Sequence, residues 1–236
     1  MTPPPAITDR MALLLDLDGT LIDFAPTPLA VTVPPGLADS LAALRKRLGG
    51  ALAIVTGRPV DQIGWLLPGI PHAVAGEHGA AIRYAPGDPI ERGAHPSVPA
   101  AWLEQAEAAL AAHPGALLER KAHGVTLHFR QAPEAAPFLR TLADALLAQL
   151  PSHALLAGSM VWEVRPRGID KGNALRTLMA RPPFAGRTPL FIGDDVTDED
   201  AIQAARALGG IGLRVDQVFG TPQDVRDWLA AEAARG

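Results

Sequence analysis

The chain has 236 residues, 48% of them hydrophobic, with a formal net charge of −4 and no cysteine. This length and composition suit one or two globular domains and exclude a disordered protein, and the acidic balance gives no basic surface for nucleic acid. Without cysteine there are no disulfides or thiolate metal sites, and no apolar stretch approaches the roughly 18 residues of a membrane span. Residues 1–10 lack the basic start and apolar run of a signal peptide, so we expect a cytoplasmic protein.

The first predicted strand, 12–17, runs directly into paired carboxylates. A short, continuous apolar run is typical of a parallel strand buried on both faces, and ligands bind beyond the carboxyl ends of such strands. Asp16 and Asp18 lie at that end, just before Gly19. Two carboxylates so close repel each other unless a cation such as Mg²⁺ or Ca²⁺ lies between them. The alternative is that these residues only make a turn.

Strand and helix then alternate up to residue 75, which predicts βαβ units and a parallel sheet. Thr56 ends the second strand and Pro59 lies in the first turn of the next helix. A hydroxyl and free N–H groups at a helix start favour an anion, although Thr56 could also be only a turn residue. The predicted elements are helix 37–47, strand 51–56, helix 59–66 and strand 72–75.

The alternation stops at 84–99, a segment rich in proline, glycine and charge that is typical of a linker. An αββαββ order follows, which predicts a small sheet with both helices on one face. Its elements are helix 100–112, strands 117–121 and 125–130, helix 134–150, and strands 153–157 and 160–165. One domain is therefore expected inside another.

The βα alternation resumes at residue 171, and this part carries the second acidic segment. Asp194 and Asp195 follow a predicted strand. Thr197 or Asp198 suits the cap of the next helix, and the acids that come after them suit its positive end. Lys171, one of only three lysines, opens a helix, where a cation is unfavourable unless an anion or an acidic cluster meets it. The predicted elements are helix 171–180, strand 189–193, helix 198–207, strand 210–215 and helix 222–233.

These motifs together resemble the haloacid dehalogenase-like phosphatases. The resemblance rests on Asp-x-Asp-Gly-Thr-Leu at 16–21, Thr-Gly-Arg at 56–58, Lys171, and Gly-Asp-Asp-x-x-Asp at 193–198. Over nearly the whole chain the sequence is similar to the trehalose-6-phosphate phosphatases, with further matching segments at 76–79, 119–121, 127–130, 163–168 and 193–199. The resemblance implies an α/β fold with a Rossmann-like parallel-sheet core at 1–82 and 165–236 and an inserted α/β cap at 83–164.

The resemblance also implies a reaction, the magnesium-dependent hydrolysis of trehalose 6-phosphate to trehalose and phosphate. Asp16 would form an aspartyl-phosphate, Asp18 would act as general acid and base, and Thr56 and Lys171 would bind phosphate. Asp16, the backbone carbonyl of Asp18 and Asp194 would hold Mg²⁺, and Asp195 and Asp198 would steady that shell. The partner would be a small-molecule sugar phosphate, and the protein is expected to be a monomer.

Substrate contacts are expected partly in the cap, where strand residues two apart face the same side. The alternative is that these residues are solvated positions on a half-exposed sheet, and that His78 is only a polar residue in a tight hinge. Ser159 stands where many relatives carry a basic residue, which puts one contact in doubt. The expected substrate-binding residues are Gly57, Arg58, His78, Gly79, Glu119, Lys121 and Glu163.

Two other functions remain open from the sequence. Another sugar phosphatase or a phosphohexomutase could use the same core, and a mutase would yield an isomeric sugar phosphate in place of phosphate. A non-catalytic domain that senses a sugar phosphate belongs to a different class. Such a domain would be expected to lose an acid of the first motif, whereas Asp16, Asp18 and Asp194 are all present.

Overall fold

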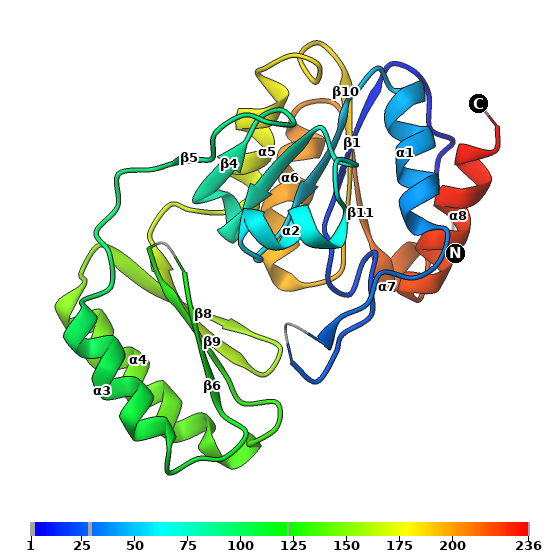
Figure 1. Ribbon diagram of the computed structural model, residues 1–236. Coiled ribbons are helices and arrows are strands. Elements are labelled where there is room, and N and C mark those ends of the chain that lie inside the picture. Colours follow the sequence, from blue (N-terminus) through cyan, green and yellow to red (C-terminus); the bar gives the residue numbers. More distant parts are fainter. Residues whose placement is uncertain (1–2, 28–29, 122, 236) are drawn as a thin grey trace. The chain divides into compact units, whose positions relative to one another are not determined.

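The computed structural model describes residues 3–27, 30–121 and 123–235, so Met1 and Gly236, the outer limits of the predicted core, lie outside it. The contacts divide the chain into two compact units (Figure 1). The first, Met1–Arg92 with Asp170–Gly236, is called the core unit below. The second, Gly93–Ile169, is called the inserted unit.

The core unit contains a seven-stranded sheet in the order β11-β10-β1-β2-β3-β4-β5. The strands from β11 to β3 run parallel, and β4 and β5 extend one edge in antiparallel pairing. The expected parallel-sheet α/β class is therefore confirmed. The strands are β1 (Met11–Leu15), β2 (Leu52–Val55), β3 (Ala73–Gly76), β4 (Ala81–Arg83), β5 (Glu91–Arg92), β10 (Thr188–Gly193) and β11 (Ile211–Arg214).

Helices cover both faces of this sheet. α1 packs with α8, α5 packs with α6, and the two pairs lie on opposite faces (Figure 1). Covering both faces explains why the central strands are apolar along their length rather than alternating. The helices are α1 (Leu37–Arg47), α2 (Val60–Leu66), α5 (Lys171–Met179), α6 (Glu199–Ala207), α7 (Val215–Val218) and α8 (Pro222–Ala233), with 3₁₀ turns η2 (Glu77–Gly79) and η4 (Val196–Asp198).

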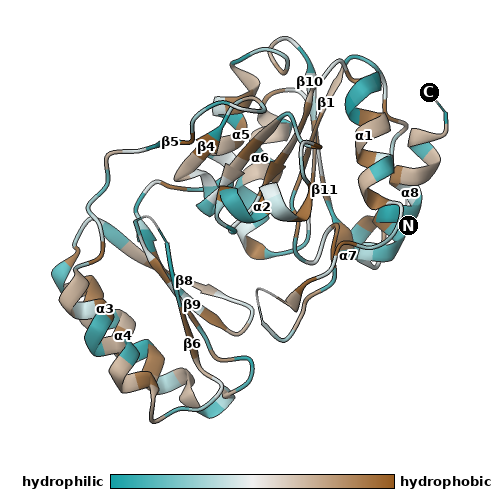
Figure 2. Cartoon of the chain, in the orientation of Figure 1, coloured by the Kyte–Doolittle hydropathy of each residue, from teal (hydrophilic) through white to brown (hydrophobic). Residues whose placement is uncertain are grey.

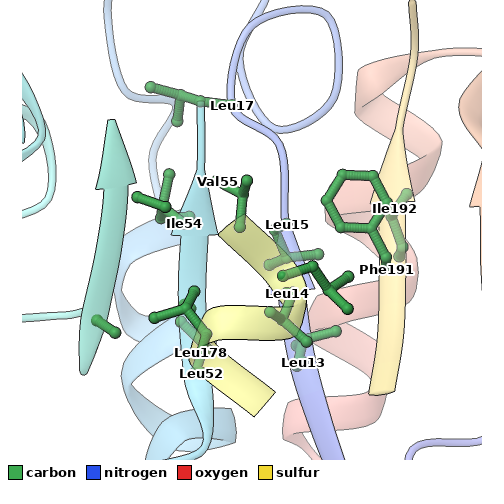
Figure 3. Packing of buried hydrophobic residues seen from close by; sticks show 14 of the residues in the cluster. Leu13, Leu14, Leu15, Leu17, Leu52, Ile54, Val55, Leu178, Phe191 and Ile192 are labelled. Carbon is green, nitrogen blue, oxygen red and sulfur yellow. The ribbon is translucent and has the colours of Figure 1, made fainter. Parts of the chain in front are cut away.

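The hydrophobic core of this unit lies on the central strands. All four residues of β2 are buried, and Leu14 of β1 pairs with Phe191 of β10. Leu178 of α5 closes the same cluster (Figure 3), and the hydrophobic colour follows β1 and β10 in Figure 2. Each fully buried side chain of this size contributes about 1.5–3 kcal/mol, which fixes the strands firmly.

The topology decides where a site can form. The chain leaves β1 for β2 and β3 on one side of the sheet, and it later fills β10 and β11 on the other side. In open parallel sheets ligands bind beyond the carboxyl ends of the strands at such a switch point. Here that point is the end of β1 and β10, where Asp16 and Asp194 follow the two strands.

The inserted unit is a four-stranded antiparallel sheet in the order β6-β7-β9-β8. Val125, Leu127 and Val164 on its strands join Trp102 of α3 and Leu139 of α4 in one hydrophobic cluster. Both helices therefore pack on one face of the sheet, as predicted. The elements are α3 (Ala100–Leu110), β6 (Leu117–Arg120), β7 (Val125–His128), η3 (Pro133–Ala135), α4 (Ala136–Gln149), β8 (His153–Gly158) and β9 (Val161–Pro166).

The structure also differs from the predictions in places. The segment 84–99, predicted as a linker, contains β5, which pairs with β4 through Ile82 and Glu91. Neither these two short strands nor α7 was predicted, because two to four residues carry no readable periodicity. In the described part of the chain, no helix combines the length and the apolar character that a membrane span requires.

Candidate active site

Carboxylates from two strand ends meet in the core unit. Asp16 follows β1, and Asp194 follows the neighbouring strand β10. Asp198 joins them from η4, and one carboxylate oxygen from each of the three lies within 4.8 Å of the other two. Two acidic segments far apart in the sequence therefore form one cluster.

Lys171 ties this cluster together. Its Nζ donates to Asp16 Oδ1 and to Asp198 Oδ1, at 2.7 Å in each case, and the residue is only 3% exposed. Asp170 caps α5 by accepting a hydrogen bond from the backbone N–H of Asn173, so Lys171 is the first helical residue. The two carboxylates supply the acidic cluster that a cation at this helix end requires.

Burial dominates the ionisation of these groups. It raises the pKa of Asp16 well above its ordinary value; Lys171 opposes this rise and Asp198 adds to it. The pKa of Asp194 rises to about 7, first through burial and then through Asp198 and Asp195. Burial disfavours the charge on Lys171, but Asp16 and Asp198 nevertheless raise its pKa far above the usual range. The ionisation of each group in the cluster therefore depends on the charges of the others.

The cluster fits a divalent metal ion. Three carboxylates, those of Asp16, Asp194 and Asp198, lie together, and the ammonium group of Lys171 pairs with the first and the last of them. Three negative charges and one positive charge leave two negative charges unbalanced when all four groups are ionised. Carboxylate oxygens are ligands that hard divalent cations prefer, and such a cation would balance this charge.

Two further residues of the first motif shape the cluster. Gly19 has φ 79°, and a Cβ there would lie 2.2 Å from Asp194 Oδ2, so a side chain would displace that carboxylate. Thr20 Oγ1 lies 3.2 Å from Asp16 Oδ2 and 3.4 Å from Asp194 Oδ1, within hydrogen-bonding reach of both. Thr20 was not predicted as a site residue; its place inside the motif is the signal that could have found it.

Asp195 and Asp198 both bond to the backbone around η4. The side chain that caps η4 is that of Asp195, which accepts from the backbone N–H and the hydroxyl of Thr197 at 2.8 and 2.6 Å. Asp198 Oδ2 reaches back to the backbone N–H groups of Asp194 and Asp195, both at 3.1 Å. Asp198 is the N-cap residue of α6, as expected, but its side chain makes no capping hydrogen bond to that helix, and Asp195 lies outside the group of three carboxylates.

Asp18 is held by Arg58 in a bidentate ion pair. Arg58 Nε and Nη2 donate to the two carboxylate oxygens of Asp18 at 2.6 and 2.7 Å, and Nη1 donates to Gln62 Oε1 at 3.0 Å. The backbone N–H of Arg58 donates to the hydroxyl oxygen of Thr56, which is 1% exposed. The motifs at 16–21 and 56–58 are thus joined through Asp18, which the sequence did not reveal.

His78 lies against the same motif from a strained turn. Glu77 and His78 have φ values of 51° and 58°, and Gly79 follows at 106°, so three consecutive residues are left-handed. The backbone N–H of His78 donates to the carbonyl oxygen of Thr56 at 2.9 Å. A Cβ on Gly57 would lie 2.8 Å from His78 Nε2, so the imidazole ring is packed onto Gly57.

The predicted sugar-binding residues Glu119, Lys121 and Glu163 belong to the inserted unit. Lys121 Nζ donates to Glu163 Oε1 at 3.0 Å, and both side chains are less than a tenth exposed. His128 Nε2 lies 2.9 Å from Glu119 Oε2. Burial raises the pKa of Glu119, but the hydrogen bond from His128 and the charge of Lys121 outweigh it and hold that pKa below its ordinary value.

His128 was not predicted as a partner of Glu119, because the register of β6 against β7 is not readable from the sequence. Pairing Leu117 opposite His128 places that ring two residues along the strand from Glu119 on the same face. Ser159, the position at which a basic residue was expected from the family, accepts a hydrogen bond from Arg130 through its carbonyl oxygen at 3.2 Å. The polar face is thus built from several strands.

Comparisons with known proteins find trehalose-phosphate phosphatases among the relatives of this chain. The family model described as trehalose-phosphatase matches residues 14–226. A probable trehalose-phosphate phosphatase from Sinorhizobium fredii is 42% identical over 233 residues, which cover 97% of this chain and 86% of that protein. A trehalose-6-phosphate phosphatase from Escherichia coli is 35% identical over 237 residues, covering 97% and 89%.

The fold has a solved counterpart as well. The C-terminal domain of a trehalose-6-phosphate phosphatase from C. albicans superposes with a TM-score of 0.77 at 21% identity. The superposition covers 96% of this chain and 92% of that domain. At this identity the likeness supports the fold, while the relatives above carry the family.

Proposed function

This chain belongs to the trehalose-phosphatase family, and on that premise we propose that it hydrolyses trehalose 6-phosphate to trehalose and inorganic phosphate. The observation that carries the chemistry is the Lys171 bridge between Asp16 and Asp198, at 2.7 Å to each. A buried ammonium group among carboxylates at a strand end suits a dianionic phosphate, because phosphoryl transfer depends mainly on positioning and charge neutralisation.

Asp16 is the proposed nucleophile. One carboxylate oxygen attacks phosphorus, the bond from phosphorus to the sugar oxygen breaks, and an aspartyl-phosphate forms. Asp18 gives its proton to the departing sugar oxygen and then takes a proton from the water that attacks phosphorus. Water cleaves the aspartyl-phosphate, which releases phosphate and restores Asp16. Thr56 and Lys171 hold phosphate oxygens during both steps.

The Arg58 ion pair places a condition on the role of Asp18. Both carboxylate oxygens of Asp18 accept hydrogen bonds from the guanidinium, whereas the acid role requires a proton on one of those oxygens. The bound phosphate competes for the same guanidinium. We assign Arg58 to the substrate phosphate. When the guanidinium binds the phosphate in place of Asp18, a carboxylate oxygen of Asp18 can carry the proton that the acid role requires.

The divalent metal proposed for the cluster is Mg²⁺. Asp16, Asp194 and the backbone carbonyl of Asp18 are the proposed ligands. Asp198 has both oxygens bonded already, to Lys171 and to two backbone N–H groups, so it and Asp195 hold the ligand segment in place. When bound, Mg²⁺ supplies charge neutralisation for the phosphate oxygens.

The inserted unit is proposed to act as the cap that recognises the sugar. Glu119, Lys121 and Glu163 offer carboxylates that accept from sugar hydroxyls and an ammonium group that donates to them. Gly57, His78 and Gly79 are proposed to contact substrate from the core unit. We further propose that the enzyme acts as a monomer in the cytoplasm.

A panel of sugar phosphates tests the proposed function. Phosphate release should be most efficient with trehalose 6-phosphate, should stop in excess chelator, and should return with Mg²⁺. An isomeric sugar phosphate as the product would identify a mutase instead.

Two variants separate the roles of the aspartates. Asp16→Asn should form no aspartyl-phosphate, whereas Asp18→Asn should still bind phosphate and lose roughly a hundred- to ten-thousand-fold in turnover. Asp144→Asn, which alters an exposed ion pair with Arg140, is the control and should leave turnover unchanged. Near-normal turnover by Asp16→Asn would refute the assignment of the nucleophile.

A further inference from the structure

The two faces of the inserted sheet differ sharply in character. Val125, Leu127 and Val164 are fully buried on the face that packs against α3 and α4. Thr126 alternates with the first two, so it lies on the opposite face. There Thr126 pairs in register with Glu119 of β6 on one side and with Glu163 of β9 on the other. A hydroxyl therefore sits at the centre of a row whose flanks are carboxylates.

The outer groups of this face have partners, whereas the described part of the chain offers none to the central hydroxyl. Lys121 pairs with Glu163 and His128 pairs with Glu119. Thr126 is 4% exposed, and among the described residues no atom forms a hydrogen bond with its Oγ1. Arg165, two residues after Glu163 on β9, likewise buries an Nη1 that has no partner in the described part of the chain. The face thus holds hydrogen-bonding capacity that the described residues leave unused.

A buried hydroxyl of this kind is unfavourable for folding. Removing a hydroxyl from water without a compensating hydrogen bond lowers stability, and valine would fill nearly the same shape without that loss. Valine also favours a strand at least as well as threonine does. The contacts of the described residues therefore give no reason for a hydroxyl at position 126, and we look for its partner among ligands.

We propose that Thr126 is a specificity-determining residue whose hydroxyl bonds a hydroxyl of the substrate sugar, an assignment that rests on the proposed function. The ligand chemistry follows from the neighbours. Glu119 and Glu163 accept hydrogen bonds, Lys121 donates them, and a threonine hydroxyl does both. An uncharged pyranose, whose hydroxyls also donate and accept, matches this set. Thr126 would contact one face of the pyranose ring, between the carboxylates of Glu119 and Glu163.

Replacing Thr126 by valine tests this assignment. Kinetics should be measured with the sugar phosphate that the wild type hydrolyses most efficiently and with a small aryl phosphate. In Thr126→Val the kcat/KM for the sugar phosphate should fall by about 3- to 10-fold, mainly through KM, because one neutral hydrogen bond is lost. Hydrolysis of the aryl phosphate should not change, since the core-unit residues are untouched.

Two controls separate binding from folding. Thr126→Ser keeps a hydroxyl and should recover most of the lost kcat/KM. Thr141→Val removes an exposed α4 hydroxyl that donates to the carbonyl oxygen of Pro137, and it should change neither substrate. The melting temperature of Thr126→Val should be unchanged or raised by about 2–4 °C, because an unpaired buried hydroxyl has been removed.

The contrary outcomes are equally defined. Unchanged kcat/KM for the sugar phosphate in Thr126→Val would overturn the assignment, and so would a parallel loss on both substrates or a fall in melting temperature. A wild type that prefers a different sugar phosphate would overturn the proposed substrate, while Thr126 would be judged on the preferred one. A wild type with no preference for any sugar phosphate over the aryl phosphate would overturn both.

Discussion

At the scale of single residues, the ion pair between Arg58 and Asp18 links the phosphate-binding motif to the proposed acid. Both donors come from one planar guanidinium, at 2.6 and 2.7 Å, so the pair has the fork geometry that lysine cannot reproduce. Gln62 fixes the third nitrogen of the fork. A phosphate dianion offers oxygens that suit the same fork, so Arg58 has two competing acceptors in the catalytic cycle.

Truncation of Arg58 is therefore expected to damage every phosphate monoester. Arg58→Ala should lower kcat/KM for trehalose 6-phosphate and for an aryl phosphate alike by about 10- to 100-fold, the range for a lost charge-assisted hydrogen bond. Arg58→Lys should recover only part of this. The control is Arg140→Ala, which removes an exposed ion pair with Asp144 on α4 and should not alter either rate. Unchanged steady-state kinetics in Arg58→Ala would show that the phosphate does not need this guanidinium.

The same scale shows how far a site can be predicted from a sequence. Asp16, Lys171 and Asp194 were predictable as neighbours, because each follows a strand end or opens a helix and parallel topology brings such positions to one edge. The Arg58 to Asp18 pair was not, because it depends on side-chain directions. Thr126 was also beyond reach, since its missing partner is visible only when the register of β6, β7 and β9 is known.

At the scale of elements, the most unusual segment is the left-handed turn that follows β3. Two consecutive non-glycine residues with positive φ, Glu77 and His78, are unfavourable on their own. Backbone hydrogen bonds from Glu77 to Arg58 and from His78 to Thr56 hold the turn against the start of α2. The imidazole of His78 is buried there and packs onto Gly57.

Gly57→Ala probes this contact. The added Cβ would approach His78 Nε2 to 2.8 Å, so the variant should lose about 1–3 kcal/mol of unfolding free energy through overpacking. Gly64→Ala on α2 is the matched control, because nothing lies within 4 Å of its Cβ and alanine favours a helix over glycine by about 1 kcal/mol. It should be neutral or stabilising in urea unfolding.

A double-mutant cycle identifies the clashing group. In a His78→Ala background, Gly57→Ala should change the unfolding free energy much less, because the ring is absent. Equal losses in both backgrounds would place the clash elsewhere, in the backbone of the 56–58 turn.

Long elements were predictable where their chemistry is local. α8 begins at Pro222 behind a capping box between Thr221 and Asp224, and the predicted helix 222–233 is confirmed. The strands of the hairpin between β8 and β9 were predicted too, at 153–157 and 160–165, but their turn carries no local signal. The two-residue turn places Met160 at φ 63°, where glycine or asparagine is usual, so the turn lacks the expected residues. Nonlocal pairing of β9 with β7 stabilises that hairpin.

At the scale of the whole molecule, the two units have separate hydrophobic cores, and the carboxylate cluster belongs to one of them. The core unit is broken in sequence by the inserted unit, yet its strands β1 and β10 pair along their full common length. The cluster at their ends is the point where the two halves of the core unit meet. A change of charge in this cluster should therefore change the unfolding free energy of the whole core unit, since both of its sequence segments contribute carboxylates.

Without metal, the cluster should make the protein less stable as the pH rises. The pKa of Asp194 lies at about 7 in the folded state, above its ordinary value of 3.8. For a carboxyl group whose folded pKa is raised, stability is fully present below the unfolded pKa and is lost as the pH passes through the folded pKa. The melting temperature of the chelator-treated protein should therefore fall between about pH 5 and pH 8, and Asp194→Asn should flatten this fall.

Mg²⁺ should reverse the trend, because it binds the ionised carboxylates and therefore the folded state. The melting temperature should rise with Mg²⁺ concentration, more at pH 8 than at pH 5, and the rise should be lost in Asp194→Asn. This measurement needs no turnover, so it tests the metal site independently of the substrate. Asp216→Asn, which alters an exposed partner of Arg214, is the control and should keep the full response. If the melting temperature at pH 8 does not change with Mg²⁺ concentration, Lys171 and protons alone neutralise the cluster.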